Sequence, residues 1–324
     1  MNDIMTWRER LIIYLKGMAM GTADIIPGVS GGTMAFILGI YERLLAAIRA
    51  VNWTWFSKVR RFKWAEATAL LDIWFLIPLI AGIISAFIVF TRVIPLPLWL
   101  NTHPELVYGL FFGLIAGSVW VLLTGLQRDT QNDKANSLFT PKSGALLAVG
   151  IIIGLLVVNL VPADTPDASW FYFICGMVAI SAMLLPGISG SFILLILGKY
   201  AAVLEAISEF NLHILFPFAF GCGVGLMGFA RIIGYCIGRW PHAMVKLICG
   251  LLIGTLYAIW PFQERVFVTV SGKQKLLEST PIWPMQWQQE EWLAVGLMLL
   301  GVALVIAMAR WAATHESSQA APLA

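Results

Sequence analysis

Two short stretches of the sequence combine proline, glycine and serine in the same order, DIIPGVSGG at 24–32 and MLLPGISGS at 183–191. In each stretch the proline lacks an amide hydrogen and ends a helix, while the glycines permit a tight reversal of the chain. Ser30 and Ser189 then stand where the N-cap of an outgoing helix belongs. The unpaired amides and the positive dipole end of such a helix can bind an anion, phosphate above all.

The candidate phosphate-binding residues follow from this arrangement. They are the residues that open the two outgoing helices, together with two arginines: Ser30, Gly31, Gly32, Thr33, Ser189, Gly190, Ser191, Arg92 and Arg231. The residues expected to break the two helical hairpins are Pro27, Gly28, Pro186 and Gly187. The alternative is that the small residues only allow neighbouring helices to pack closely.

Arg92 and Arg231 each interrupt a long segment that is otherwise uncharged. A charge inside a membrane span costs at least about 2.5–3.5 kcal/mol, so each arginine needs a compensating partner or must extend to the lipid headgroups. A guanidinium group also matches the oxygens of a phosphate in a bidentate manner. Both interpretations, substrate binding and contact with headgroups, stay open.

Asp24 has no counterpart in the second stretch, where Met183 takes its place. It can pair with an arginine, cap the hairpin, or bind a coupling proton or cation. Neither serine has a neighbouring base of the kind that hydrolysis requires, so no catalytic residue is assigned. The four cysteines lie in apolar segments without the spacing of metal ligands, so neither a metal site nor a cofactor is expected.

The elements that position these residues must be membrane helices. Of the 324 residues, 59% are hydrophobic and 12% are charged, which excludes an ordinary soluble domain. The uncharged run at 143–163 is long enough as a helix to cross about 30 Å of hydrocarbon. Ten-residue segments of alternating hydrophobicity are absent, so we expect an all-α polytopic membrane protein.

The chain is a duplication. When residues 27–48 are laid over 186–207, 11 of 22 positions are identical, and a second alignment of 73–94 with 212–233 places Arg92 opposite Arg231. Internal repeats of this kind are typical of secondary transporters, whose sites lie between the repeats and are often built from interrupted helices. We therefore expect two repeats, 1–162 and 163–324.

Each repeat is expected to hold one re-entrant hairpin and three spans. The hairpins are predicted at about 11–48 and 170–207, and the spans at about 71–91, 106–125, 143–162, 212–237, 243–262 and 291–311. An alternative is that each short half-helix crosses a thin membrane steeply. With two hairpins and six spans, most Lys and Arg residues fall on the side of both termini, which should be the cytoplasm. Because each repeat crosses the membrane an odd number of times, three, the second repeat must be inserted upside down relative to the first.

The stretch MGTADIIPGVSGGTMAFILGIYERLLAAI, with its second copy LLPGISGSFILLILGKY, resembles the polyprenyl-phosphate transporter family of the bacterial inner membrane. The resemblance covers essentially the whole chain, and its signature residues here are Asp24–Thr33 and Pro186–Ser191. It implies translocation of undecaprenyl phosphate from the outer to the inner leaflet, for recycling in cell-envelope synthesis. The implied partners are this or a related polyprenyl phosphate and membrane lipids, with no nucleic acid. The oligomeric state, a homo-oligomer included, stays open.

Two other functions fit parts of the pattern. A membrane phosphatase that acts on undecaprenyl pyrophosphate would also bind a phosphate headgroup, but it would need an acid, base or nucleophile set. A transporter or channel for a small anion would use the same glycine loops and arginines. A side opening toward lipid would favour the long-chain substrate.

Overall fold

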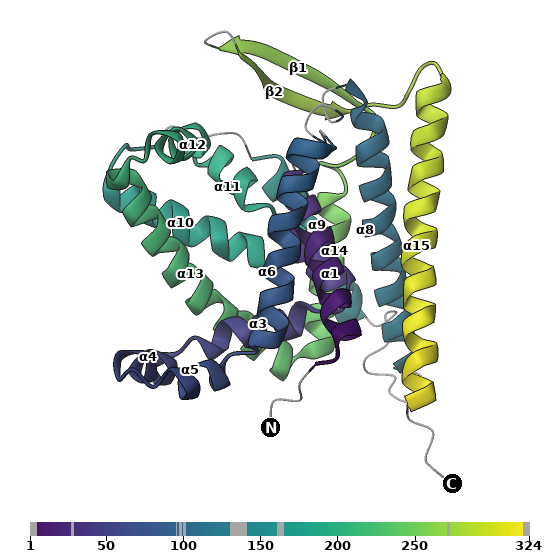
Figure 1. Ribbon diagram of the computed structural model, residues 1–324. Helices are drawn as coiled ribbons and strands as arrows, with labels where there is room; N and C mark the ends of the chain where they lie inside the picture. The colour runs from purple at the N-terminus through teal and green to yellow at the C-terminus, as the bar shows by residue number, and fades with distance from the viewer. Residues whose placement is uncertain are drawn as a thin grey trace. The chain divides into compact units, whose positions relative to one another are not determined.

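The computed structural model describes residues 5–26, 29–94, 96, 99, 102–129, 141–160, 165–270 and 273–319. Helices dominate this part of the chain, as the composition predicts (Figure 1). They divide into two compact units, one of Met1–Pro97 with Asn159–Met244 and one of Leu98–Val158 with Val245–Ala324. Each unit therefore takes one segment from each half of the chain.

The first unit contains both motif stretches and the helices around them. From the first half it takes α1 (Trp7–Ile25), α2 (Gly31–Ile37), α3 (Tyr41–Ala50), α4 (Trp53–Arg60), α5 (Trp64–Leu70), α6 (Ile73–Ile88) and the π-helical turn η1 (Val89–Val93). From the second half it takes α10 (Ser169–Leu184), α11 (Gly190–Ile196), α12 (Tyr200–Glu209) and α13 (Leu212–Arg239).

Equivalent glycines bring equivalent helices together in this unit. Gly17 of α1 and Gly82 of α6 each lie against the backbone of the opposite helix, and a Cβ at either position would collide with a carbonyl oxygen. Gly176 of α10 and Gly221 of α13 do the same for the second pair. The first sequence alignment, extended upstream without a gap, pairs Gly17 with Gly176, and the second pairs Gly82 with Gly221, so the sequence similarity is matched by similar packing.

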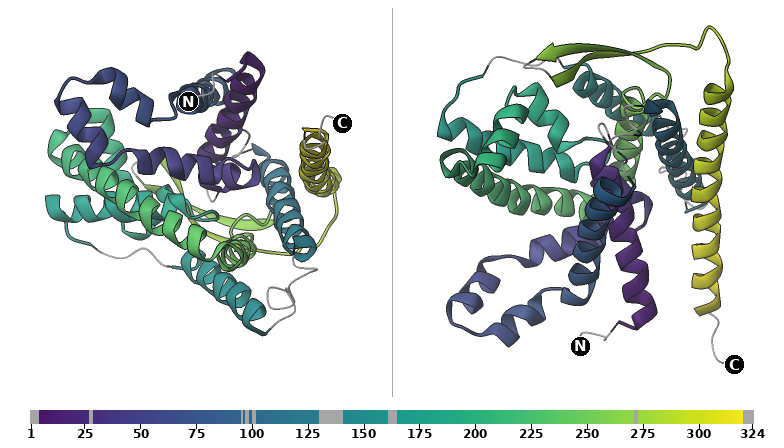
Figure 2. Two further views of the ribbon diagram at one scale, coloured as in Figure 1. Left: turned by 90° about the horizontal axis from the view of Figure 1, so that it is seen from below. Right: turned by 45° about the horizontal axis from the view of Figure 1, so that its top comes forward.

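The outgoing arm of each hairpin is broken. We expected one continuous half-helix after each motif, and this prediction is wrong. α2 and α3 meet at 119°, and α11 meets α12 at 116° (Figure 2). At both breaks a glycine adopts a left-handed conformation, with φ of 68° at Gly39 and 65° at Gly198, which ends the first helix after two turns.

The second unit contains the remaining helices. They are α8 (Pro104–Asp129), α9 (Pro141–Val158), most of α14 (Pro241–Thr255) and α15 (Gln289–Gln319). Gly113 of α8 lies against the backbone of α15, whereas Gly250 of α14 lies against α9 at Gly150. α8 and α14 occupy equivalent places in the two predicted repeats, and each packs against the last helix of the opposite half.

Several of these helices are suited to crossing a membrane. By length and composition α8, α13 and α15 qualify alone, and up to six spans result if each bent helix pair counts as one. The predicted span at about 243–262 is too long, because α14 ends at Thr255 and the chain continues in turns. The described part of the chain is therefore that of a multi-pass membrane protein, as predicted.

The all-α prediction needs one correction. Strands β1 (Gln263–Val270) and β2 (Lys273–Pro281) form an antiparallel hairpin in the second unit, with Gln263 opposite Pro281 (Figure 1). Residues 266–270 are Val, Phe, Val, Thr and Val, all residue types that favour a strand. The predicted spans treat this segment as a connection without secondary structure.

Candidate functional site

The first motif is closed by its own side chains. Ser30 caps α2, since its Oγ accepts a hydrogen bond from the Gly32 amide at 3.2 Å. The Asp24 carboxylate reaches across from the end of α1 and accepts a hydrogen bond from the Gly31 amide at 2.7 Å. This hydrogen bond is the contact that a capping role requires, and the coupling role of Asp24 stays a prediction. A Cβ on Gly31 would lie 2.5 Å from this carboxylate, so a larger residue there would require the Asp24 side chain to move.

The second motif lacks this closure. Met183 replaces the aspartate, and Ser189 at the N-cap of α11 makes no capping hydrogen bond. Instead the hydroxyls of Ser189 and Ser191 lie 2.9 Å apart and share a hydrogen bond. Gly187 has a φ of 98°, so the chain reverses here through a conformation that favours glycine.

The structure brings the two motifs into direct contact within the first unit. The Gly187 amide donates a hydrogen bond to Thr33 Oγ1 at 2.7 Å, and the Ser30 hydroxyl donates to the Met183 carbonyl at 3.5 Å. The Tyr41 hydroxyl donates to the Leu184 carbonyl at 2.6 Å. Segments about 150 residues apart in the chain thus form one polar junction. Pro27 and Gly28, two of the predicted break residues, lie outside the described residues.

Burial separates the two sets of predicted phosphate ligands. In the first motif Ser30 and Thr33 are each 1% exposed, and Gly31 and Gly32 are also buried. In the second motif Gly190 and the break residues Pro186 and Gly187 are buried, whereas Ser189 is half-buried and Ser191 is exposed. Among the described motif residues, the serine hydroxyls of the second motif are the hydrogen-bond donors that remain accessible.

The two predicted arginines lie elsewhere. Arg231 is exposed on α13, where its guanidinium donates hydrogen bonds to the Met227 carbonyl at 2.9 Å and the Val51 carbonyl at 3.2 Å. Arg92 is exposed on η1. Among the described residues, no hydrogen bond or ion pair joins either arginine to a motif residue. Their roles, ligand binding or contact with headgroups, therefore stay predictions.

Sequence reasoning missed Arg49, which accompanies Arg231. The Arg49 guanidinium lies against the Gly234 backbone, one helical turn beyond Arg231, and its Nε is buried without a hydrogen-bond partner among the described residues. Two guanidinium groups therefore lie at the contact between α3 and α13. The signal that could have found Arg49 was its place at the end of an apolar hairpin arm.

Sequence reasoning also missed the groups that fix the two breaks. In the first copy Lys16 donates to the Leu38 carbonyl at 2.7 Å, and in the second Thr165 donates to the equivalent Leu197 carbonyl at 2.6 Å. The buried Lys199 then donates to the Thr165 carbonyl at 3.0 Å and pairs with Asp167. The hydrogen bond from the ammonium group lowers the pKa of Asp167. Each helix end at a break is thus tied to the entry of its hairpin.

With this geometry in place, comparisons with known proteins become informative. Residues 20–277 match the undecaprenyl phosphate translocase-like family. The chain belongs to this family. It is 39% identical over 311 residues to a polyprenyl-phosphate transporter of Vibrio cholerae, covering 93% of this chain and 97% of the relative. It is 38% identical over 266 residues to a polyprenyl-phosphate transporter of Staphylococcus aureus, covering 77% of this chain and 86% of that relative.

Membership in the undecaprenyl phosphate translocase-like family confirms the resemblance recognised from the two motifs. The matched region begins just before Asp24 and includes both motifs and all of the first unit from Met20 onward. The relatives' names support a transport role over an enzymatic one. No solved structure gives a significant match to this one.

Proposed function

We propose that this protein translocates undecaprenyl phosphate, or a related polyprenyl phosphate, from the outer to the inner leaflet of the bacterial cytoplasmic membrane. The observation that carries this proposal is family membership over most of the chain, together with two relatives named as polyprenyl-phosphate transporters. Return of the carrier lipid to the inner leaflet would make it available again for cell-envelope synthesis. The protein would act as a flippase without a cofactor.

The proposed headgroup site is the junction of the two motifs. A lipid phosphate needs hydrogen-bond donors, and the hydroxyls of Ser189 and Ser191 are the accessible ones at this junction. The amides of Gly190 and Ser191 open α11 beside them. The polar groups at the start of α2 already make hydrogen bonds within the protein. They would become available to the phosphate only when the contact between the motifs opens, and the residues that would then join the site are Ser30, Gly31, Gly32 and Thr33.

The arginines are proposed to act on either side of this site. Arg231, with Arg49 beside it, would attract the phosphate at the contact between α3 and α13, and Arg92 would do so at the end of α6. The hydrogen bond from Arg231 to the Val51 carbonyl leaves other donors of its guanidinium available. Asp24 is proposed to hold the first motif in its closed form.

The transport cycle is proposed to use an inverted repeat with both termini in the cytoplasm. Two observations support the internal symmetry: the equivalent glycine contacts of α1 with α6 and of α10 with α13, and the exchanged packing of α8 on α15 and α14 on α9. A symmetric pair of hairpins allows the junction to open first toward one leaflet and then toward the other. The apolar tail would stay in lipid throughout.

The test is leaflet transfer in liposomes that contain the purified protein and undecaprenyl phosphate. A membrane-impermeant phosphatase is added outside, so that lipid from the inner leaflet is cleaved only after translocation. We expect nearly all of the lipid to be cleaved with the protein present, against about half in protein-free liposomes. The same liposomes should neither release phosphate from undecaprenyl pyrophosphate nor pass inorganic phosphate.

Three results would contradict the proposal. Cleavage that stops at about half would show that the protein does not move the lipid. Phosphate release from the pyrophosphate without added phosphatase would establish a hydrolase instead. Passage of inorganic phosphate without lipid transfer would establish a small-anion transporter.

A further inference from the structure

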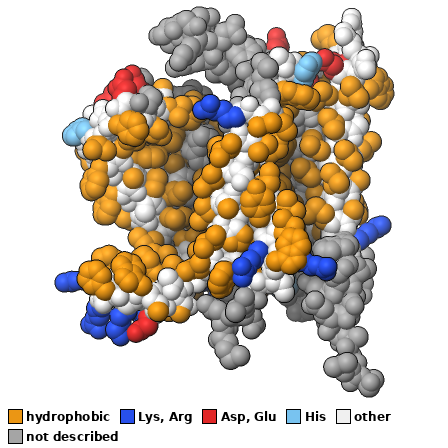
Figure 3. Space-filling model, in the orientation of Figure 1, with side chains coloured by type: hydrophobic (Ala, Val, Ile, Leu, Met, Phe, Trp, Pro, Cys, Tyr) orange, Lys and Arg blue, Asp and Glu red, His pale blue; other side chains and the backbone are white. Residues whose placement is uncertain are grey.

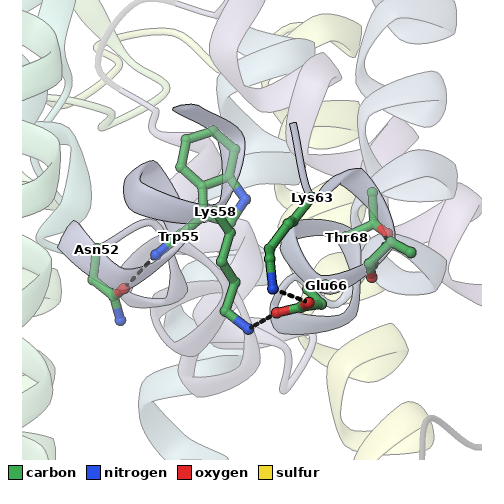
Figure 4. Close-up of polar contacts among 7 residues, drawn as sticks. Asn52, Trp55, Lys58, Lys63, Glu66 and Thr68 are labelled. Carbon is green, nitrogen blue, oxygen red and sulfur yellow. Dashed lines mark hydrogen bonds and ion pairs between the residues drawn. The ribbon is translucent and has the colours of Figure 1, made fainter. Parts of the chain in front are cut away.

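Helices α4 and α5, with their turn, form a pair that the rest of the first unit barely covers. This pair, residues 52–71, is called the interfacial hairpin below. Asn52 starts it by capping α4, since its side chain accepts a hydrogen bond from the Trp55 amide at 3.0 Å (Figure 4). α4 has no buried residue, and α5 buries only Ala67. Most of the surface of the interfacial hairpin is therefore not covered by other described elements.

Four large aromatic side chains lie on this uncovered surface. Trp53 and Phe62 are each 78% exposed, Trp64 is 56% exposed and Phe56 is 50% exposed. They form two pairs, with ring centroids 5.6 Å apart for Trp53 and Phe56 and 6.2 Å apart for Phe62 and Trp64. Such a concentration of exposed rings in a short segment marks a surface that meets an apolar or mixed environment.

The same segment is strongly basic. It contains Lys58, Arg60, Arg61 and Lys63 against a single acidic residue, Glu66. Glu66 accepts hydrogen bonds from Lys58 at 2.9 Å and from Lys63 at 2.8 Å, which ties α4 to α5 (Figure 4). The hydrogen bond from Lys63 contributes most to lowering the pKa of Glu66 to about 2. Arg60 and Arg61 are exposed and make no ion pair with another described residue.

The interfacial hairpin is turned away from the helix that follows it. α5 and α6 meet at 74°, and the ion pair of Arg43 with Asp72 at 2.7 Å ties this corner to α3. α6 exposes large apolar side chains along its length, including Ile80 and Ile84, as expected for a helix that faces lipid. If α6 crosses the membrane, α5 must lie close to the plane of the membrane surface.

The surface view agrees with such a placement. In the lower left of Figure 3, hydrophobic side chains gather along the upper edge of α4 and α5, and Lys or Arg side chains gather along the lower edge. A helix pair with aromatic residues on one side and basic residues on the other is typical of segments that lie at the bilayer interface and contact anionic headgroups.

We propose that the interfacial hairpin binds the anionic lipid headgroups of one membrane leaflet, with its aromatic rings in the headgroup and acyl boundary. A second copy of the chain is a poorer occupant, because a symmetric contact would bring the same basic groups together. This surface is separate from the proposed transport site, and its lipid contacts do not depend on translocation. The protein would thereby recognise the charge of the bilayer that surrounds it.

The test uses the full-length protein in nanodiscs that hold one copy each, made with either zwitterionic or partly anionic lipid. A spin label is placed at Phe56→Cys or at Arg61→Cys in a background without the four native cysteines, and Ile84→Cys on α6 is the lipid-exposed reference. In anionic discs we expect the label at position 56 to be accessible to oxygen and shielded from a water-soluble relaxation agent. The label at position 61 should remain accessible to that agent.

A charge variant sharpens the test. In Arg60→Gln with Arg61→Gln we expect the population with position 56 immersed in anionic discs to fall, by roughly fivefold in equilibrium constant for each charge removed. Arg8→Gln with Arg239→Gln, which removes two exposed arginines outside the hairpin, should leave it unchanged. Hydrogen exchange of the unmodified protein gives a second readout, since amides of α4 and α5 should exchange more slowly in anionic than in zwitterionic discs.

Three results would overturn the proposal. One is equal accessibility of positions 56 and 61 to the water-soluble agent in every disc. Another is immersion and hydrogen exchange that do not change with lipid charge. The third is shielding of position 56 from both oxygen and the water-soluble agent, which would show that protein rather than lipid covers the surface.

Discussion

The two copies of the motif have nearly the same residues, yet side chains close only the first. In the first copy Asp24 and Ser30 accept hydrogen bonds from successive amides at the start of α2. In the second copy Met183 stands in place of the aspartate, and Ser189 bonds to Ser191 rather than to the backbone. One duplicated loop has thus become two different polar environments.

Under the proposed function, this difference would divide a structural role and a ligand-binding role between the two copies. The closed copy is buried and supplies Thr33 and Tyr41 as partners for the backbone of the other copy. The open copy keeps hydroxyls at the surface. A buried polar group without a partner is costly, so the closed copy must satisfy its own groups, whereas the open copy can leave its groups for a ligand.

The largest effect is expected where the first copy is given a residue of the second. In Gly32→Ser the new Cβ would lie 2.5 Å from the Met183 carbonyl oxygen, so the two motifs must separate. We expect a loss of about 2–3 kcal/mol in the free energy of unfolding, measured by denaturant titration in mild detergent. The reciprocal Ser191→Gly, at an exposed position, should cost about 1 kcal/mol or less. Equal losses would remove the distinction between the copies.

A smaller loss is expected when the carboxylate that closes the first copy is removed. Asp24→Ala leaves the Gly31 amide without its acceptor and should lower the free energy of unfolding by about 1–2 kcal/mol. Asp24→Asn keeps an acceptor oxygen and should recover most of this loss in the same titration. If both variants unfold like the unmodified protein, capping is not the role of Asp24.

The equivalent tyrosines of the two copies allow a closely matched pair. Tyr41 is buried and bonds to the Leu184 carbonyl, whereas Tyr200 is 38% exposed. Tyr41→Phe should cost about 1 kcal/mol of unfolding free energy, and Tyr200→Phe should change it by less than about 0.5 kcal/mol. Thermal unfolding of both variants side by side checks this, and a larger effect at Tyr200 would contradict the assigned contact.

The smallest effect is expected for the pH dependence of stability, through the ion pair near the break of the second copy. The pKa of Asp167 is lowered in the folded protein, so its ion pair with Lys199 stabilises the fold above the unfolded pKa of about 3.9. This contribution is lost as the pH falls through the lower folded pKa. Asp167→Asn should therefore reduce the melting temperature at pH 6 more than at pH 3. The reverse order would show that the pair does not stabilise the break.

Much of this organisation could be predicted from the sequence because it depends on local signals. The proline, glycine and serine order placed both helix breaks, and the internal alignment identified equivalent helices. The second break in each hairpin was missed, since it depends on the left-handed glycines Gly39 and Gly198 inside apolar runs that otherwise favour helix. Which motif is buried also escaped prediction, because burial is set by the packing of α2 against α10 and not by the motif itself.

The arginines show the limit of inference from equivalent positions. Arg92 and Arg231 align in the repeat, but one lies on a π-helical turn and the other bonds to the end of α3. Alignment fixes a place along the chain, whereas a side chain with four rotatable bonds reaches different partners in different surroundings. The partner of Arg231, the Val51 carbonyl, belongs to the opposite half of the chain and carries no signal in the sequence.

The most direct measurement of the central claim is lipid transfer by a variant that closes the open copy. The Met183 side chain lies next to Gly190, with its Cβ 3.5 Å from where a Cβ on Gly190 would be. Met183→Asp would place a carboxylate there, as in the first copy, and repel a lipid phosphate. We predict that it slows undecaprenyl phosphate transfer in liposomes at least about tenfold, while the neutral Met183→Leu transfers normally. Transfer by Met183→Asp at the unmodified rate would contradict a headgroup site at the second motif.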